Sequence, residues 1–359
     1  MKIIYPLFFI VLLSTCIMEP SNNGDKPNKI VFKDSTALDY QQYILPDKPT
    51  KHKDIPKFEE KAELGKVLYF TKINGAACSD CHSPKHGFTA GQQQSCGRGC
   101  EGTPPNRRPI PGADTDTPPI KSPSSIGVFG SNNLLWTGLA GSRKGPWEGL
   151  VHSILGQGIL ATNAHDMRLA TDSVRANHPQ IFDEFKKIYT DVDESRLCEP
   201  DDIAECLAAF QMRLIPNNSR FQEWLKGEEE LSPKAVRGVK AFDTKCANCH
   251  KPPFLGDDTF MDVGFPHLVN NIHDGDDKVK DGRFLVTKKE GDRGKFRVMR
   301  LATNVAAHIT WGHGGTFNTL EDCISGHQGI DSVSVAEIDD IIEFLNMTTD
   351  RDLLDMVPQ

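Results

Sequence analysis

The chain contains two short stretches in which two cysteines and a histidine stand at a chemically specific spacing. They read CSDCH at residues 78–82 and CANCH at residues 246–250. A C-x-x-C-H sequence attaches a c-type haem: the two thiols add to the haem vinyl groups, and the histidine lies under the iron as an axial ligand. The pattern therefore predicts thioether bonds and proximal iron ligands at six residues: Cys78, Cys81, His82, Cys246, Cys249 and His250.

One copy of this pattern can arise by chance or form half of a zinc site. A structural zinc site needs further paired cysteines at ligand spacing. The remaining pairs, Cys96/Cys100 and Cys198/Cys206, are more widely spaced, and no histidine directly follows them. Because the motif occurs twice, each time after a helical pattern, we expect two covalently bound c-type haems.

Covalent haem attachment takes place outside the cytoplasmic membrane, so these motifs imply an exported, periplasmic protein. Such a compartment permits disulfides. Cys96/Cys100 and Cys198/Cys206 are candidate pairs, and the sequence leaves their state open.

The N-terminal residues agree with export. Lys2 precedes an apolar run at residues 3–13, which is too short to span a bilayer and is typical of a signal peptide. The run ends in a stretch that resembles a lipoprotein cleavage box, with Cys16 as the lipidated residue; the alternative is an ordinary signal that is cleaved together with Cys16. We expect a signal peptide or lipoprotein box at residues 1–16 and a polar tether at residues 17–55.

The length and charge narrow the class of protein. The 359 residues can form two domains, each with its own core. The net charge is −8 and there is no long basic run, so we do not expect a nucleic-acid partner.

The elements that position the motifs are predicted to be helices, because apolar residues recur at helical spacing before each motif. Ser334 and Glu337 form a capping box before the last helix. No strand-rich region is evident, so the fold class is mainly α, with two cytochrome-c-like domains that each hold one haem. The expected helices lie at residues 58–70, 146–155, 167–176, 201–214, 233–242 and 335–345.

Several stretches resemble the bacterial dihaem cytochrome c peroxidases, a family that includes MauG-type maturation enzymes. Three of these stretches belong to the first half of the chain. They are LGKVLYF, which precedes the first motif; CHSPKHGFTAG, which begins at its second cysteine; and SPSSIGVFGSNNLLWTG further on. LSPKAVRGVKAFDTKCANCH, DGRFLVTKKEGDRGKFRV and NVAAHITWGHGGTFNTLED are similar to the family's second half. The resemblance implies a peroxidatic haem domain at residues 56–225 and an electron-transfer haem domain at residues 226–350.

The resemblance also implies roles for single residues around the first haem. Trp136 matches the tryptophan that relays electrons between the haems; without the resemblance, an ordinary core residue would be the first interpretation. Asp166 matches the acidic residue that moves a proton during peroxide cleavage, although it is one methylene shorter than the usual Glu. His165 is an alternative, and Asp166 can also simply cap the next helix. Since His86 is not at a ligand position, we expect the first iron to be open or water-bound.

The second haem is predicted to have a histidine as its distal ligand. The resemblance places this ligand fourteen residues after His313, at His327, where peroxidases usually have Met and MauG has Tyr. A surface position for His327 is the alternative, and Met299 is a rival ligand. The absence of Tyr argues against MauG-type chemistry.

The sequence does not favour a calcium site between the two haems. The family often binds Ca²⁺ between its haems through an Asn, but the matched residue is Lys121, which has no oxygen donor in its side chain and cannot ligate Ca²⁺. We predict that calcium is absent or bound elsewhere.

We therefore expect a peroxidase that reduces hydrogen peroxide to water with electrons from a small cytochrome c or cupredoxin. The alternatives are a dihaem electron-transfer protein without peroxide turnover and a MauG-like enzyme that oxidises a protein. Homodimers are common in the family, so a homodimer is a further expectation.

Overall fold

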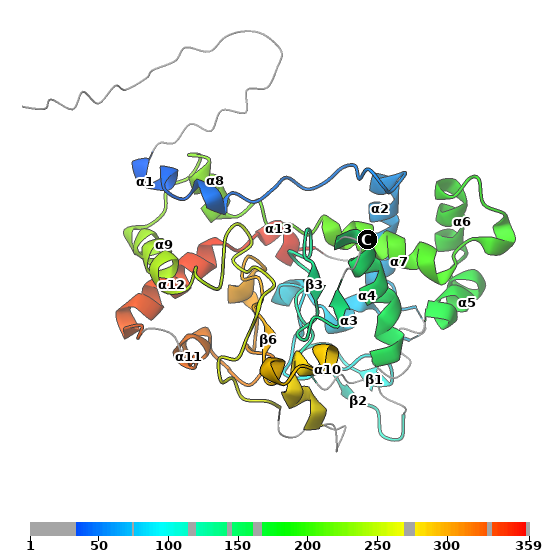
Figure 1. Cartoon of the computed structure of the whole chain (residues 1–359). Coiled ribbons are helices and arrows are strands. Elements are labelled where there is room, and N and C mark those ends of the chain that lie inside the picture. The colour runs from blue at the N-terminus through cyan, green and yellow to red at the C-terminus, as the bar shows by residue number, and fades with distance from the viewer. Residues whose placement is uncertain are drawn as a thin grey trace, which may run out of the picture. The chain divides into compact units, whose positions relative to one another are not determined.

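The computed structural model describes residues 34–73, 75–113, 120–141, 146–160, 167–268, 277–328 and 332–356. Within these ranges the protein is mainly helical, as predicted (Figure 1). The helices are α1 (Ser35–Leu38), α2 (Phe58–Phe70), α3 (Cys78–Cys81), α4 (Pro146–Leu160), α5 (Met167–Asn177), α6 (Pro179–Ile188), α7 (Pro200–Met212), α8 (Arg220–Leu225), α9 (Pro233–Lys245), α10 (Phe284–Thr287), α11 (Leu320–Ser325), α12 (Val335–Met347) and α13 (Arg351–Leu354).

Strands are few and short in the described residues. They form three antiparallel pairs, and each strand is two residues long. The pairs are β1 (Cys100–Glu101) with β2 (Arg108–Pro109), β3 (Asn133–Leu134) with β4 (Ala140–Gly141), and β5 (Phe260–Met261) with β6 (Phe296–Arg297). They fix the ends of loops and build no sheet core.

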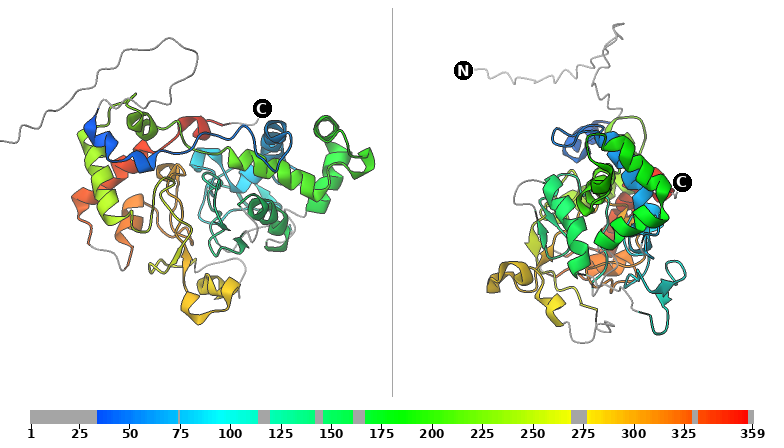
Figure 2. Two further views of the ribbon diagram at one scale, coloured as in Figure 1. Left: turned by 45° about the horizontal axis from the view of Figure 1, so that its top comes forward. Right: turned by 90° about the vertical axis from the view of Figure 1, so that its right-hand side faces the viewer.

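Each haem motif follows a helix that packs against a later helix. α2 leads to the first motif and lies against α7, and α9 leads to the second motif and lies against α12 (Figures 1 and 2). A glycine allows both close approaches: a Cβ on Gly65 would collide with the carbonyl of Cys206, and one on Gly238 with the carbonyl of Asp340. The two halves thus use the same device to place their motifs.

The buried apolar residues form two clusters that correspond to these helix pairs. One contains residues of α2, α4, α6 and α7, including Leu68 and Phe210. The other contains residues of α8, α9 and α12, including Phe242 and Phe344. The two-domain boundary stays a prediction, since the described residues belong to one compact unit.

The expected helices are confirmed, and their caps form as the sequence indicates. Ser232 caps α9 through the backbone N–H of Ala235, and Ser334 with Glu337 forms the capping box of α12. The predicted tether is wrong for its described part. Tyr43 and Leu45 are buried in the second cluster. Packing these aromatic and aliphatic side chains against the cluster removes their apolar surface from water, which is favourable.

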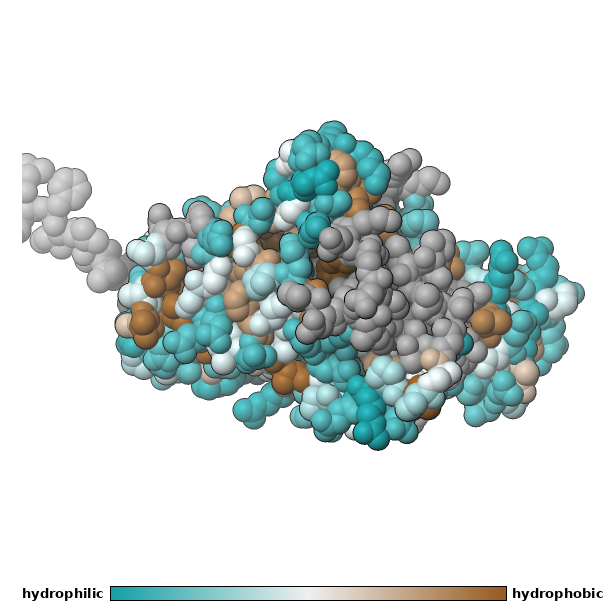
Figure 3. All heavy atoms as spheres, turned by 90° about the horizontal axis from the view of Figure 1, so that it is seen from below, coloured by the Kyte–Doolittle hydropathy of each residue, from teal (hydrophilic) through white to brown (hydrophobic). Residues whose placement is uncertain are grey.

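Of the candidate disulfides, the structure forms Cys96–Cys100 and leaves Cys198 and Cys206 as separate buried thiols. No helix in the described ranges is both long and apolar enough to cross a membrane. On the face seen in Figure 3, hydrophilic side chains predominate among the coloured residues, and hydrophobic ones form separate small groups.

Candidate haem sites and the wall between them

The first motif forms one helical turn, α3, and His82 follows it. The Asp80 carboxylate caps this turn by accepting the backbone N–H of Ala77 at 3.1 Å. His82 Nδ1 lies 2.8 Å from the carbonyl oxygen of Pro123. A carbonyl can only accept, so Nδ1 carries the proton and Nε2 presents a free lone pair to a metal. Burial lowers the pKa of His82, which keeps the imidazole neutral and suited to ligation.

A cavity with apolar walls adjoins the first motif. Cys78 and His82 line it together with Tyr69 and leucines of the 134–150 region. Apart from Cys78 and His82, its described lining contains no cysteine, methionine or histidine. The described residues therefore offer one axial ligand on this side.

The second motif repeats the arrangement of the first. His250 Nδ1 lies 3.1 Å from the carbonyl oxygens of both Leu255 and Met299. Burial and the nearby His327 lower the pKa of His250 to about 4. His250 is thus also a neutral imidazole whose Nε2 is available for iron.

The cavity beside the second motif contains a second imidazole opposite the first. His327 follows α11, and its Nδ1 lies 2.8 Å from the carbonyl oxygen of Cys323. The ring centres of His250 and His327 are 6.4 Å apart. Two imidazoles that bind one metal from opposite faces, with metal–nitrogen bonds of about 2.0–2.1 Å, bring their ring centres to roughly this separation. The rival Met299 has its carbonyl on the His250 side, so the geometry favours His327.

A short segment and one tryptophan form the wall between the two cavities. Pro123 and Arg297 line both cavities, and Trp136 lines the second directly after Leu135, which lines the first. The Trp136 indole N–H donates to the carbonyl of Lys121 at 2.7 Å. Trp136 therefore lies beside the segment shared by the two cavities, and its role as an inter-haem residue stays a prediction.

The wall also holds an excess of buried positive charge. Arg297 and Arg300 both pair with the single carboxylate of Asp258, at 2.7 Å and 3.4 Å. Arg300 Nε is buried and has no hydrogen-bond partner among the described residues. Because both guanidiniums line the second cavity, the two haem propionates would fit as their missing anionic partners. Thiols, neutral imidazoles and this charge together fit bound haem.

Sequence reasoning missed two features near these cavities. His313 stacks on Phe296 with ring centres 3.7 Å apart, and its Nε2 lies 2.8 Å from His267 Nδ1. Its ring centre is 6.1 Å from that of Trp136. Long-range contacts of this kind leave no periodic signal in a sequence.

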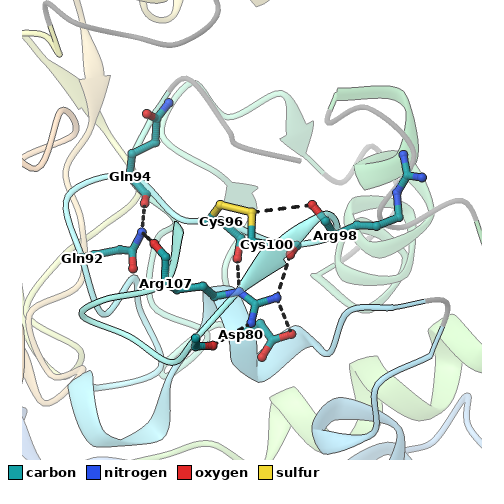
Figure 4. Close-up of a disulfide and its surroundings, with 9 residues drawn as sticks. Asp80, Gln92, Gln94, Cys96, Arg98, Cys100 and Arg107 are labelled. Carbon is teal, nitrogen blue, oxygen red and sulfur yellow. Dashed lines mark hydrogen bonds and ion pairs between the residues drawn. A yellow bond between two sulfur atoms is a disulfide. The ribbon is translucent and has the colours of Figure 1, made fainter. Parts of the chain in front are cut away.

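The second missed feature is a clamp on the first motif, shown in Figure 4. Arg107 is almost fully buried; it pairs with Asp80 at 3.3 Å and donates to the carbonyls of Cys96, Gly97 and Gly102. The disulfide closes the loop that supplies the first two of these carbonyls, and Gly102 lies just beyond the loop. The loop therefore holds the haem-attachment turn through the residue between its two cysteines.

Asp166 and its alternative His165 lie outside the described residues. The same is true of Cys16 and the remaining N-terminal export signals. Their predicted roles stay predictions.

Comparison with known proteins adds independent findings. A family model described as "Di-haem cytochrome c peroxidase" matches residues 59–230. The chain is 25% identical over 292 residues to cytochrome c551 peroxidase of Pseudomonas aeruginosa, which covers 78% of this chain and 75% of that protein. It is 27% identical over 302 residues to cytochrome c peroxidase Ccp of Escherichia coli, covering 81% of this chain and 58% of that protein.

MauG proteins and solved structures are similar as well. The methylamine utilization protein MauG of Methylophilus methylotrophus is 27% identical over 236 residues, with 63% of this chain and 62% of that protein covered. The crystal structure of a MauG-like protein associated with microbial copper homeostasis superimposes with a TM-score of 0.65 at 21% identity, over 93% of this chain and 97% of the other. The dihaem peroxidase BthA of Burkholderia thailandensis gives a TM-score of 0.60 at 16% identity, over 84% and 87%. These two structures share the fold.

Proposed function

Because the chain belongs to the dihaem cytochrome c peroxidase family, which includes MauG, we propose that it reduces hydrogen peroxide to water. The electrons come from a small redox protein, a cytochrome c or a cupredoxin. The two c-type haems are attached through Cys78 and Cys81 and through Cys246 and Cys249.

The observation that carries this proposal is the difference between the two cavities. The second cavity presents His250 and His327 on opposite sides, which suits an iron with both axial positions filled. The first presents one axial imidazole, His82, in its described lining. An iron with a free axial position can bind peroxide, whereas one with two protein ligands is suited to storing an electron. The first site is therefore the peroxidatic one.

The chain's own residues orient and connect the sites. The Pro123 carbonyl fixes the ring of His82 and its tautomer, which also raises the basicity of Nε2. When bound, the haems supply the redox chemistry of peroxide cleavage. Trp136 lies in the wall between the cavities and would divide the electron path into two shorter steps.

Peroxide cleavage also needs a group that moves a proton from the inner to the outer oxygen, so that water can leave. We assign this role to Asp166, with His165 as the alternative. Both assignments rest on the sequence.

The setting follows from the same chemistry. Covalent haem attachment requires export, so we propose a periplasmic protein with a signal segment at residues 1–16, lipid-anchored if Cys16 is modified. A homodimer is part of the proposal and is tested by its mass in solution.

The proposal is tested by peroxide consumption of the purified holoprotein with a reduced cytochrome c as donor. The all-ferric form is compared with a form reduced by one electron. Donor oxidation that depends on peroxide in either form is the expected result. No turnover in both forms, with two six-coordinate low-spin spectra, would show an electron-transfer protein instead.

A further inference from the structure

Lys121 is a buried cation in the wall between the two cavities. It is 2% exposed, and its Nζ donates to Thr89 Oγ1 at 3.1 Å. Among the described residues, no carboxylate lies within ion-pair distance of this ammonium. Burying a charge without a counter-ion costs desolvation free energy. A role for this charge in the chemistry of the site would explain why a lysine stands here.

The backbone of Lys121 fixes the position of this charge. Its N–H donates to the carbonyl of His313 at 2.9 Å, and its carbonyl accepts the indole N–H of Trp136. Two residues further on, Pro123 holds His82. The side chain of Lys121 lines the second cavity. The backbone of Lys121 is therefore fixed relative to Trp136 and to the segment that holds His82, and its side chain lies at the second haem site.

The matched positions for calcium do not suit a calcium ion in this chain. Ca²⁺ takes roughly six to eight oxygen ligands. Here a lysine replaces the family's Asn, and His308, which is half-buried, stands where the family has a Thr. The Nε2 atom of His308 is buried and has no hydrogen-bond partner among the described residues. A cation and an imidazole thus occupy the place where oxygen donors are needed.

Resting on the two-haem function proposed above, we propose that the Lys121 ammonium replaces calcium as the positive charge between the two haem sites. A fixed positive charge stabilises the ferrous state, because ferric iron carries one more positive charge than ferrous iron. Lys121 therefore raises the reduction potential of the second haem, which offsets part of the lowering that a second histidine ligand brings.

The first test uses the wild-type holoprotein and needs no variant. The protein is equilibrated with Ca²⁺, freed of unbound ions and examined by elemental analysis; a second sample is treated with a calcium chelator. We expect far less than one calcium ion per chain, and reduction potentials that the chelator leaves unchanged. One tightly held calcium ion per chain would overturn the proposal.

The second test compares Lys121→Met with Lys245→Met by spectroelectrochemical titration of both haems. Lys245 also lines the second cavity but is partly exposed, so water screens its charge. We expect Lys121→Met to lower the second potential clearly more than Lys245→Met does, and Lys121→Arg to retain most of the wild-type value. Equal shifts in the two methionine variants would contradict the proposal.

These readouts separate the inference from the proposed enzyme activity. Metal content and reduction potentials require bound haems but no peroxide turnover. If Lys121→Met does not fold, the calcium measurement on the wild type still decides.

Discussion

At the scale of residues, the three predicted axial histidines share one backbone arrangement. The Nδ1 atoms of His82, His250 and His327 each lie close to a carbonyl oxygen, at 2.8, 3.1 and 2.8 Å. Each carbonyl fixes the tautomer and leaves Nε2 free to bind iron. If these histidines bind iron, their tautomer is set by backbone carbonyls of residues outside the two C-x-x-C-H motifs.

The identity of the second distal ligand is testable by substitution. We expect His327→Ala to convert the second haem from a six-coordinate low-spin to a five-coordinate high-spin spectrum. His327→Met should restore six coordination and raise the second reduction potential by on the order of 0.1 V, because thioether favours ferrous iron. Absorption spectra and potentiometric titration measure both effects. An unchanged low-spin spectrum in His327→Ala would identify another ligand.

The charge of Lys121 should make the second reduction potential depend on pH. Burial lowers the pKa of Lys121 from 10.5 to about 7, while the nearby Cys323 acts to raise it. His308, whose Nε2 atom is buried, also faces this charge, and desolvation lowers its pKa well below the usual value, so it stays neutral.

A lysine with this pKa is protonated below pH 7 and loses its charge above it. The potential difference between wild type and Lys121→Met should therefore be largest near pH 6 and shrink toward about pH 9. Titrations at both ends of this range check the sign. A difference that is constant, or that grows with pH, would contradict it.

At the scale of elements, glycines decide how closely the haem-bearing helices approach their partners. Overpacking a close helix contact costs about 1–3 kcal/mol. We expect Gly65→Ala and Gly238→Ala each to lower the free energy of unfolding by at least this amount, since the added methyl meets a backbone carbonyl. Gly291→Ala is the control, because a Cβ there meets no atom within 4 Å. Denaturant unfolding of the three variants gives the comparison, and three equal values would refute it.

The disulfide loop and Arg107 form the second element with a testable role. Removing one partner of a buried ion pair costs about 3–5 kcal/mol, whereas a disulfide that closes so short a ring contributes roughly 2 kcal/mol. Arg107→Met should therefore destabilise the protein more than the double change Cys96→Ser/Cys100→Ser.

Arg108→Met is the matched control for this clamp, because Arg108 is exposed and, among the residues that the structure describes, pairs only with the exposed Glu101. Denaturant unfolding ranks the variants, and the spectrum of the first haem shows whether its attachment turn has moved. A larger loss from removing the disulfide than from removing Arg107 would show that the covalent link is the main restraint.

At the scale of the whole molecule, we expect the two cavities to have different roles: the first haem binds peroxide and the second stores an electron. We expect two haems per chain in the wild type and one in each of two variants, Cys78→Ser/Cys81→Ser and Cys246→Ser/Cys249→Ser. Mass spectrometry of the denatured protein counts the covalent groups. Loss of the first haem should abolish peroxide consumption and leave the bis-histidine spectrum intact; persistent consumption would move the peroxide site to the second haem.

The sequence by itself determined the chemistry that depends on local spacing. Thiols and histidines at fixed intervals predicted the haem motifs, and apolar periodicity predicted α2, α7, α9 and α12, the last two with Ser caps. Counting from His313 led to His327, which the structure places opposite His250. These features are short-range or carried by a motif, so one chain suffices to find them.

Only the tertiary structure decided what depends on contacts between distant segments. The buried anchoring of Tyr43 in the expected tether needs a core built from distant residues such as Phe221, against which its ring packs. Its hydroxyl donates to the carboxylate of Asp243, 200 positions further along the chain. The pairing of Arg107 with Asp80, and of Arg297 and Arg300 with Asp258, joins charges that no periodicity relates. Burial also decided the properties of Lys121. The motif match placed Lys121 at the family's calcium position, but its charge matters because folding removes water from around it.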